Sequence, residues 1–183
     1  HRLRNLADAV MVGSGTILKD DPRLNVRLLK KSGRQPVPVV LDMKLKTPAS
    51  SKIFSAHENV IIVTGKSHDA NRRRKLEASG ATVIEAKAGS DGMLDLRDVA
   101  RKLGKMEITS LLIEGGSRTA ALALKSGIVD KVVFFYAPRI IGADGLSMVG
   151  DLGISRVGSS LKIEKIKVSK LGEEFMVEGY AAK

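Results

Sequence analysis

The sequence predicts an α/β fold in which a mostly parallel sheet is covered by helices on both faces. Short apolar runs alternate along the chain with helix-like stretches. The runs are nearly continuous, as in strands buried on both faces, rather than alternating in polarity. The composition, 43% hydrophobic and 28% charged, is that of an ordinary globular domain. The 183 residues therefore fit a single domain, 1–183, with a sizeable core.

Strands are expected where an apolar run ends at a turn residue. The first run ends at Gly13 and the second at Asp42. The last two are expected to pair as a hairpin across Leu171-Gly172-Glu173. The expected strands are 9–12, 37–41, 60–63, 82–84, 110–113, 131–137, 161–169 and 174–180.

Helices are expected between these strands. An amphipathic stretch places Leu96, Val99 and Leu103 on one side, and Gly80 is positioned to end another helix. The chain opens on His1-Arg2-Leu3-Arg4, which is typical of a helix interior, so we expect the natural N-terminus upstream. The expected helices are 14–19, 69–79, 95–104 and 117–126.

The net charge of +11 predicts an anionic partner. Only 3% of the residues are aromatic, and single-stranded nucleic acid usually needs spaced aromatic side chains on which its bases stack. A phosphate-bearing metabolite is therefore favoured over nucleic acid. The run Arg72-Arg73-Arg74-Lys75 is interpreted as a solvated helix face, with nucleic-acid binding as the minority interpretation.

Several classes of chemistry are disfavoured by the composition. The chain has no cysteine, which removes disulfides, zinc–thiolate sites and thiol nucleophiles. The histidines His1, His57 and His68 lack the spacing of a zinc site, so no metal is expected. No apolar run approaches the roughly 18 residues of a membrane span. Without a signal-peptide pattern, we expect a cytoplasmic protein that does not contact a membrane.

Two glycine-rich turns follow predicted strands and open predicted helices. The first is Gly13-Ser14-Gly15-Thr16 and the second is Glu114-Gly115-Gly116-Ser117-Arg118-Thr119. Backbone N–H groups at a helix start bind anions, and ligands of open α/β sheets collect at this edge. Each turn has a simpler interpretation, because the first can be only a turn and Glu114 can cap a nearby backbone.

A third motif, at 19–27, pairs two aspartates, Asp20 and Asp21, with two arginines, Arg23 and Arg27. Two adjacent aspartates with no nearby histidine or third carboxylate make a poor metal site. The arginines can instead bind a phosphate with two parallel hydrogen bonds. The alternative is a helix that ends at Pro22, followed by a salt-bridged loop.

Together these motifs resemble a known family. The segments ADAVMVGSGTILKDDPRLNVR (7–27), VVLD…TP (39–48) and LLIEGGSRTAALALKSGIVDKVVFFYAPRIIGADG (111–145) occur in the order found in the reductase domain of the riboflavin-biosynthesis deaminase–reductase. The resemblance runs over nearly the whole chain. It implies a dihydrofolate-reductase-like fold and a homodimer, with a fused or separate deaminase domain as a possible partner.

The resemblance also implies a reaction. It is the NADPH-dependent reduction of 5-amino-6-(5-phosphoribosylamino)uracil to its ribitylamino product. The alternatives are the 2,5-diamino-pyrimidinone form of this substrate, or a related pterin- or folate-type reductase. Two non-enzymatic alternatives stay open at this point, a basic nucleic-acid-binding domain and an inactive dimerising fragment.

Site residues follow from matching positions in the family. The carboxylates near the implied reaction centre are Asp20 and Glu114. The substrate is expected to contact Arg4, Leu24, Arg27 and Glu114, with Arg23 as a lower-ranked neighbour. NADPH is expected to contact Gly13, Gly15, Thr16, Asp20, Met43, Lys44, Gly115, Gly116, Ser117, Arg118, Thr119, Ala120, Ala121 and Leu122.

Three further expectations concern details of this resemblance. The family's first strand would lie upstream of His1, so the chain is expected to be truncated at its N-terminus and to lack a central strand. The Gly115–Gly116 bond can be a cis peptide in this fold. Lys44 or Lys46 is a candidate contact for the 2′-phosphate of NADPH.

Overall fold

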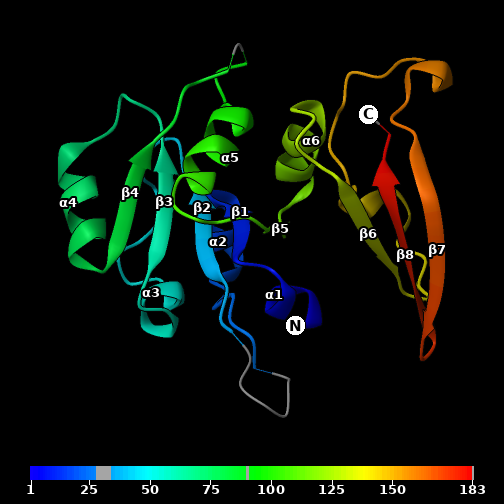
Figure 1. Cartoon of the computed structure of the whole chain (residues 1–183), viewed down its shortest axis with the longest axis horizontal. Helices are drawn as coiled ribbons and strands as arrows, with labels where there is room; N and C mark the ends of the chain where they lie inside the picture. The colour runs from blue at the N-terminus through cyan, green and yellow to red at the C-terminus, as the bar shows by residue number, and fades with distance from the viewer. Residues whose placement is uncertain (28–33, 90, 183) are drawn as a thin grey trace.

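The computed structural model describes residues 1–27, 34–89 and 91–182, and its strands form two sheets (Figure 1). The larger sheet has five parallel strands in the order β4-β3-β2-β1-β5. The smaller sheet is antiparallel, in the order β6-β8-β7. The strands are β1 (Ala9–Gly13), β2 (Val37–Leu41), β3 (Val60–Thr64), β4 (Ala81–Glu85), β5 (Leu111–Ile113), β6 (Lys131–Tyr136), β7 (Ile163–Leu171) and β8 (Glu174–Ala181).

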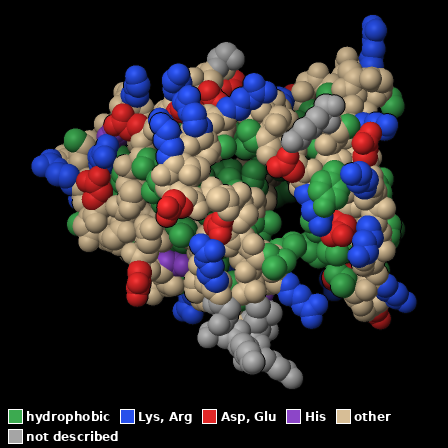
Figure 2. Space-filling model, in the orientation of Figure 1, with side chains coloured by type: hydrophobic (Ala, Val, Ile, Leu, Met, Phe, Trp, Pro, Cys, Tyr) green, Lys and Arg blue, Asp and Glu red, His purple; other side chains and the backbone are tan. Residues whose placement is uncertain are grey.

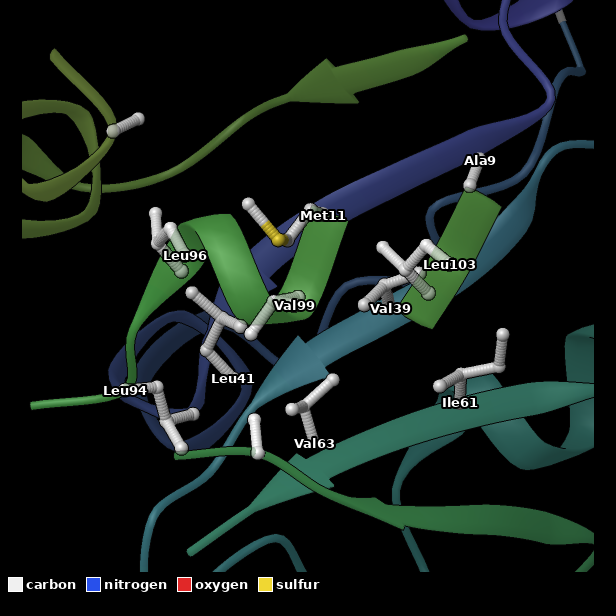
Figure 3. Packing of buried hydrophobic residues seen from close by; sticks show 12 residues of the cluster. Ala9, Met11, Val39, Leu41, Ile61, Val63, Leu94, Leu96, Val99 and Leu103 are labelled. Atoms are coloured by element: carbon white, nitrogen blue, oxygen red, sulfur yellow. The ribbon is translucent and has the colours of Figure 1, made fainter. Parts of the chain in front are cut away.

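Helices cover both faces of the parallel sheet, as the sequence predicts. One cluster of buried side chains joins Met11 and Val39 to Leu96 and Val99 of α5 (Figure 3). The other cluster takes the alternate strand residues and packs them under α2, α3 and α4. The helices are α1 (Arg2–Leu6), α2 (Ser14–Asp20), α3 (Lys52–Ala56), α4 (Ala70–Ala78), α5 (Leu96–Gly104) and α6 (Ser117–Lys125), and two 3₁₀ turns, Gly142–Asp144 and Val157–Ser159, lie between β6 and β7.

The expected α/β class, parallel sheet and C-terminal hairpin are confirmed, with three local differences. Helix α3 was not expected, because its five residues are too few to show a period and only Ile53 is buried. Strand β7 begins and ends two residues later than predicted, and the hairpin turns at Gly172 with a positive φ of 66°. The described peptide bonds are all trans, so the cis form of Gly115–Gly116 is a wrong expectation.

No strand pairing joins β5 to β6 in the part of the chain that the structure describes. Each of these strands has a hydrogen-bonded neighbour on one side only, β1 beside β5 and β8 beside β6. The two sheets therefore stand apart with open backbone edges, and Figure 2 shows the surface hollowed between them. An open edge presents unpaired N–H and C=O groups to any strand that can reach it.

Asp8 fixes the start of the short strand β5 beside β1. Its Oδ2 accepts hydrogen bonds from the backbone N–H groups of Thr109 and Ser110, each at 2.9 Å, and from the Thr109 hydroxyl at 2.7 Å. The hydrogen bonds from Thr109 and Ser110 lower the pKa of Asp8 well below its usual range. This carboxylate brings into contact two segments that lie about a hundred residues apart, which places the ends of β1 and β5 side by side.

Asp98 is a buried carboxylate whose loss should weaken the fold. Burial alone would raise its pKa, but hydrogen bonds from Lys102 Nζ (2.9 Å), the Lys87 N–H (2.9 Å) and Arg101 hold the pKa well below the usual value. We expect Asp98→Asn to cost about 1.5–3 kcal/mol of unfolding free energy at neutral pH, as for other hydrogen bonds to charged groups.

The pH dependence of this effect has a definite sign. Because the folded pKa is depressed, the stability is present above the unfolded pKa of about 4 and is lost as the pH falls below it. Urea titrations at neutral and acidic pH should therefore show the gap between wild type and Asp98→Asn narrowing in acid. Glu107→Gln is the control, since Glu107 is exposed and makes no side-chain hydrogen bond among the described residues. An equal difference in unfolding free energy between wild type and Asp98→Asn at both pH values would contradict the stabilising role of the Asp98 carboxylate.

Candidate functional site

Two glycine turns meet at the carboxyl edge of the parallel sheet. Strand β1 ends at Gly13, and β5 is followed by Glu114 and Gly115. Thr119, in the first turn of α6, lies against both turns. A Cβ built on Gly115 would lie 2.6 Å from the Thr119 Cβ, and one on Gly13 would lie 2.9 Å from its Oγ1. The two turns therefore lie side by side, as predicted. They can do so because Gly13 and Gly115 have no side chain that would collide with Thr119.

The same turns leave backbone donors available to a ligand. The N-cap residues of α2 and α6 are Gly13 and Gly116, and no side chain caps either helix among the described residues. A Cβ added at Gly15 or Gly116 would meet no atom within 4 Å, so a ligand can approach the backbone there. First-turn N–H groups facing open space suit an anion such as a pyrophosphate. The donor set thus fits a dinucleotide cofactor.

Met43 and Lys44 follow β2 at the same edge of the sheet. Met43 packs onto Gly65, where a Cβ would collide with its sulfur, and its carbonyl accepts a hydrogen bond from Thr64 Oγ1 at 3.1 Å. Lys44 is exposed, and its carbonyl accepts a hydrogen bond from Arg72 Nη1 at 3.3 Å. Arg72 is exposed, as the solvated helix face predicts, and it also contacts the Lys44 backbone.

Arg4 and Glu114 form the central ion pair of the site. Arg4 Nε donates to Glu114 Oε1 at 2.7 Å, and Nη2 donates to Oε2 at 2.6 Å. Arg4 Nη1 also donates to the Asn25 carbonyl at 3.1 Å. The hydrogen bonds and the charge of Glu114 raise the pKa of Arg4 despite its partial burial. The pair ties α1, the end of β5 and the 21–27 loop together. The structure thus brings together two residues predicted to contact substrate.

The 21–27 loop is bent twice by residues in the left-handed region. Asp21 has φ 41° and Leu24 has φ 53°, values that side-chain-bearing residues rarely adopt. Such strain persists where the surroundings fix it and concentrates at functional sites. The Leu24 side chain is only 2% exposed and packs in the core, so it anchors the loop while the arginines face outward. Leu24 still lines the basic pocket described below, so its predicted contact with substrate stays a prediction.

A basic pocket of about 480 Å³ opens beside this loop. It brings Arg4, Arg23 and Arg27 together, as the resemblance implies. It also adds residues that the sequence did not indicate, because they come from separate segments of the chain. Its lining is His1, Arg4, Asp21, Pro22, Arg23, Leu24, Arg27 and Lys52.

The two carboxylates proposed near the reaction centre lie in different settings. Glu114 is half-buried and bound to Arg4. Asp20 is exposed at the end of α2 and makes no hydrogen bond or ion pair with the described residues. The structure therefore does not bring Asp20 into the Arg4–Glu114 cluster.

A parallel sheet with two glycine turns at its edge, next to a basic pocket, defines an α/β domain whose edge suits anionic ligands. The family model described as RibD C-terminal domain matches residues 1–177, and the chain belongs to this family. The chain is 40% identical over 178 residues to the riboflavin biosynthesis protein RibD of Aquifex aeolicus, covering 97% of this chain and 47% of the relative.

Other relatives differ in how much of their length the chain covers. It is 34% identical over 180 residues to the 2,5-diamino-6-ribosylamino-4(3H)-pyrimidinone 5′-phosphate reductase of Methanothermobacter thermautotrophicus, covering 97% of this chain and 82% of that protein. A structure of Acinetobacter baumannii RibD superposes with a TM-score of 0.84 at 24% identity, over 99% of this chain and 49% of that one, which shows the fold alone. The chain thus spans about half the length of the RibD relatives it matches.

The comparisons confirm the resemblance seen in the sequence.

No helix among the described residues is both long and apolar enough to cross a membrane. No group of three potential metal-ligating side chains occurs within the described ranges either.

Proposed function

We propose that this domain catalyses the NADPH-dependent reduction of the ribosylamino side chain of a phosphorylated aminopyrimidine in riboflavin biosynthesis. One observation carries the proposal. Glu114 adjoins the glycine turn that suits a pyrophosphate, and its carboxylate binds Arg4 in the basic pocket. A dinucleotide on the turn and a phosphorylated substrate in the pocket would therefore meet beside Glu114. The names of the relatives support the same reaction.

The chain's own residues would bind and orient the two reactants. NADPH would supply the hydride, which leaves positioning and exclusion of water to the protein. The segment from Gly116, the N-cap of α6, to Leu122 would hold the pyrophosphate, together with Gly13, Gly15 and Thr16 on the neighbouring turn. Arg4, Arg23 and Arg27 would hold the 5′-phosphate. Glu114 would fix the orientation of Arg4 rather than act as a free acid, because both its oxygens are engaged.

The substrate is proposed to be 5-amino-6-(5-phosphoribosylamino)uracil, with the 2,5-diamino-pyrimidinone form as the second candidate. A Thermotoga maritima structure superposes with a TM-score of 0.76 at 31% identity, over the whole of this chain and 47% of that one. It is named a diaminohydroxyphosphoribosylaminopyrimidine deaminase/5-amino-6-(5-phosphoribosylamino)uracil reductase. The Methanothermobacter relative is named for the diamino form. The basic pocket favours either of these phosphorylated substrates over a pterin or folate without phosphate.

The domain organisation is proposed on the same basis. The open edges of β5 and β6 support one more strand between them, supplied by a segment preceding His1. A fused or separate deaminase domain, a cytoplasmic location and a homodimer complete the proposal. The exposed Ile166, Val168 and Phe175 on the antiparallel sheet give a second copy an apolar surface to pack against.

The decisive test is an assay of NADPH oxidation with the phosphorylated and the dephosphorylated substrate. The chain should be tested with the upstream segment present and absent. We expect turnover of the phosphorylated substrate when the segment is present, with much weaker turnover of the dephosphorylated one. Absence of NADPH oxidation with either form would overturn the proposed reaction.

The preference for NADPH over NADH is proposed to depend on the lysines after β2. Lys44 and Lys46 are both exposed, so their ammonium groups are free to approach the 2′-phosphate. Replacing both with glutamine should lower kcat/KM for NADPH by about tenfold, the effect of roughly 1.4 kcal/mol, and leave that for NADH unchanged. Lys105→Gln, in an exposed lysine next to α5, is the control. An unchanged NADPH/NADH ratio would contradict the role.

A further inference from the structure

Lys52 is a cation of the basic pocket that neither the motifs nor the family resemblance indicated. It is the first residue of α3, and it lines the pocket with Arg4, Arg23 and Arg27. It lies 25 positions along the chain from Arg27, outside the 19–27 motif. Only the packing of α3 against the 21–27 loop brings its ammonium to the arginines. The pocket lining therefore holds four arginine and lysine side chains, with Asp21 as its one carboxylate.

Asp21 holds Lys52 at the pocket through two contacts of different strength. Asp21 Oδ1 accepts a hydrogen bond from the Lys52 backbone N–H at 2.9 Å, which attaches α3 to the loop. Asp21 Oδ2 lies 3.5 Å from Lys52 Nζ, and the side chains are 39% and 57% exposed. An ion pair this long and exposed contributes little stability. The ammonium can therefore leave Asp21 for a stronger anion at small cost.

His57 attaches the other end of α3 to the same loop. Its Nε2 lies 2.7 Å from the Arg23 carbonyl, so the ring donates an N–H to that oxygen. Burial lowers the pKa of His57 despite this hydrogen bond, and the charge of Arg4 lowers it further. Both effects favour the neutral ring, whose Nε2 proton is donated to the Arg23 carbonyl. With Asp21 at one end and His57 at the other, α3 holds Lys52 in a fixed place relative to the arginines.

We propose that Lys52 is a fourth ligand of the substrate's 5′-phosphate and that Asp21 holds its ammonium at the pocket until the phosphate replaces the carboxylate. The inference rests on the proposed function, because it assigns the phosphate of that substrate to this pocket. Lysine binds phosphate as a compact charge, which complements the two-pronged contacts of arginine. Lys52 thereby sets the preference for phosphorylated over unphosphorylated substrate.

The test measures binding of ribose 5-phosphate, with ribose as the uncharged comparison, by calorimetry on the full chain. Lys52→Gln should lower the affinity for ribose 5-phosphate by about 10- to 30-fold, as expected for a lost hydrogen bond to a charged group. Lys52→Arg should recover most of the affinity. Lys105→Gln, which removes an exposed lysine next to α5, should change nothing. Circular dichroism and the melting temperature show whether each variant is folded.

Asp21→Asn gives an independent measurement, because the amide oxygen keeps the hydrogen bond from the Lys52 backbone while the competing charge is lost. This variant should raise the affinity for ribose 5-phosphate by about two- to threefold, which corresponds to the free energy of one exposed ion pair. Weaker binding of ribose 5-phosphate by this variant would show that Asp21 does not hold the Lys52 ammonium in competition with the phosphate.

Two negative results separate this inference from the proposed function. If Arg27→Gln weakens ribose 5-phosphate while Lys52→Gln does not, the pocket binds phosphate without Lys52 and the inference is wrong. If neither variant changes the affinity, the phosphate does not bind in this pocket, and the substrate placement in the proposed function fails with it. The NADPH oxidation assay then decides independently whether the reaction itself survives.

Discussion

Replacing Glu114 with glutamine is expected to lower kcat/KM for the phosphorylated substrate by about 30- to 100-fold, the cost of a lost hydrogen bond to a charged group. Glu114 accepts two hydrogen bonds shorter than 2.8 Å from Arg4, whose side chain is only 17% exposed. A neutral amide has one oxygen acceptor and one NH₂ donor where the carboxylate has two acceptors. The Arg4 guanidinium therefore loses one partner and its orientation in the pocket.

The affinity for NADPH should change much less than substrate turnover when Glu114 is replaced with glutamine. The Glu114 side chain points to Arg4 rather than to the first turn of α6, so the affinity for NADPH, measured by fluorescence titration, should stay close to that of wild type. Arg4→Lys, alone and combined with Glu114→Gln, completes a double-mutant cycle. The two changes should be strongly non-additive, since each breaks the same contact. Equal losses of substrate turnover and NADPH affinity would instead show that Glu114 is structural.

Replacing Gly115 with alanine is expected to reduce both stability and cofactor affinity. The added Cβ would lie 2.6 Å from the Thr119 Cβ, a contact that one side-chain rotation cannot relieve. The first turn of α6 must move, at a cost of about 1–3 kcal/mol of unfolding free energy, as in other overpacked sites. Because the N–H groups of that turn are proposed to hold the pyrophosphate, NADPH affinity should fall by about tenfold or more, the effect of 1.4 kcal/mol.

Gly13 provides a matched comparison on the neighbouring turn. A Cβ there would meet only the Thr119 hydroxyl, at 2.9 Å. Thr119→Ala should therefore rescue Gly13→Ala and leave Gly115→Ala impaired, because alanine keeps the Cβ that blocks Gly115. Melting temperatures and NADPH titrations of the two double variants measure this difference. Rescue of both variants, or of neither, would show that Thr119 does not separate the two turns as the structure has it.

Much of the fold was predictable because local patterns are strong in a buried parallel sheet. The runs ending at Gly13 and Ile113 are continuous and apolar, which marks strands covered on both faces. Gly80 ends its helix with a positive φ of 92°, as expected of a C-terminal glycine. Helix α3 escaped prediction, because five residues with a single buried anchor, Ile53, have no measurable period.

The candidate site was only partly predictable, because only some of its residues belong to local sequence patterns. The glycine turns and the 19–27 motif are local in sequence, so their residue types could be read directly. Lys52 and His57 lie in ordinary polar segments and have meaning only where α3 packs against the loop. The burial of the Leu24 side chain was not predictable, because its positive φ of 53° cannot be read from the sequence pattern.

The family, the order of strands and helices along the chain and the two glycine turns follow from the sequence alone, because each depends on neighbouring residues. Two contacts are visible only in the folded molecule: Arg4 pairs with Glu114, 110 positions away, and Thr119 lies between Gly13 and Gly115. It also divided the strands into two sheets with open edges at β5 and β6. Contacts between distant segments depend on how whole elements pack, and no local pattern along the chain records them.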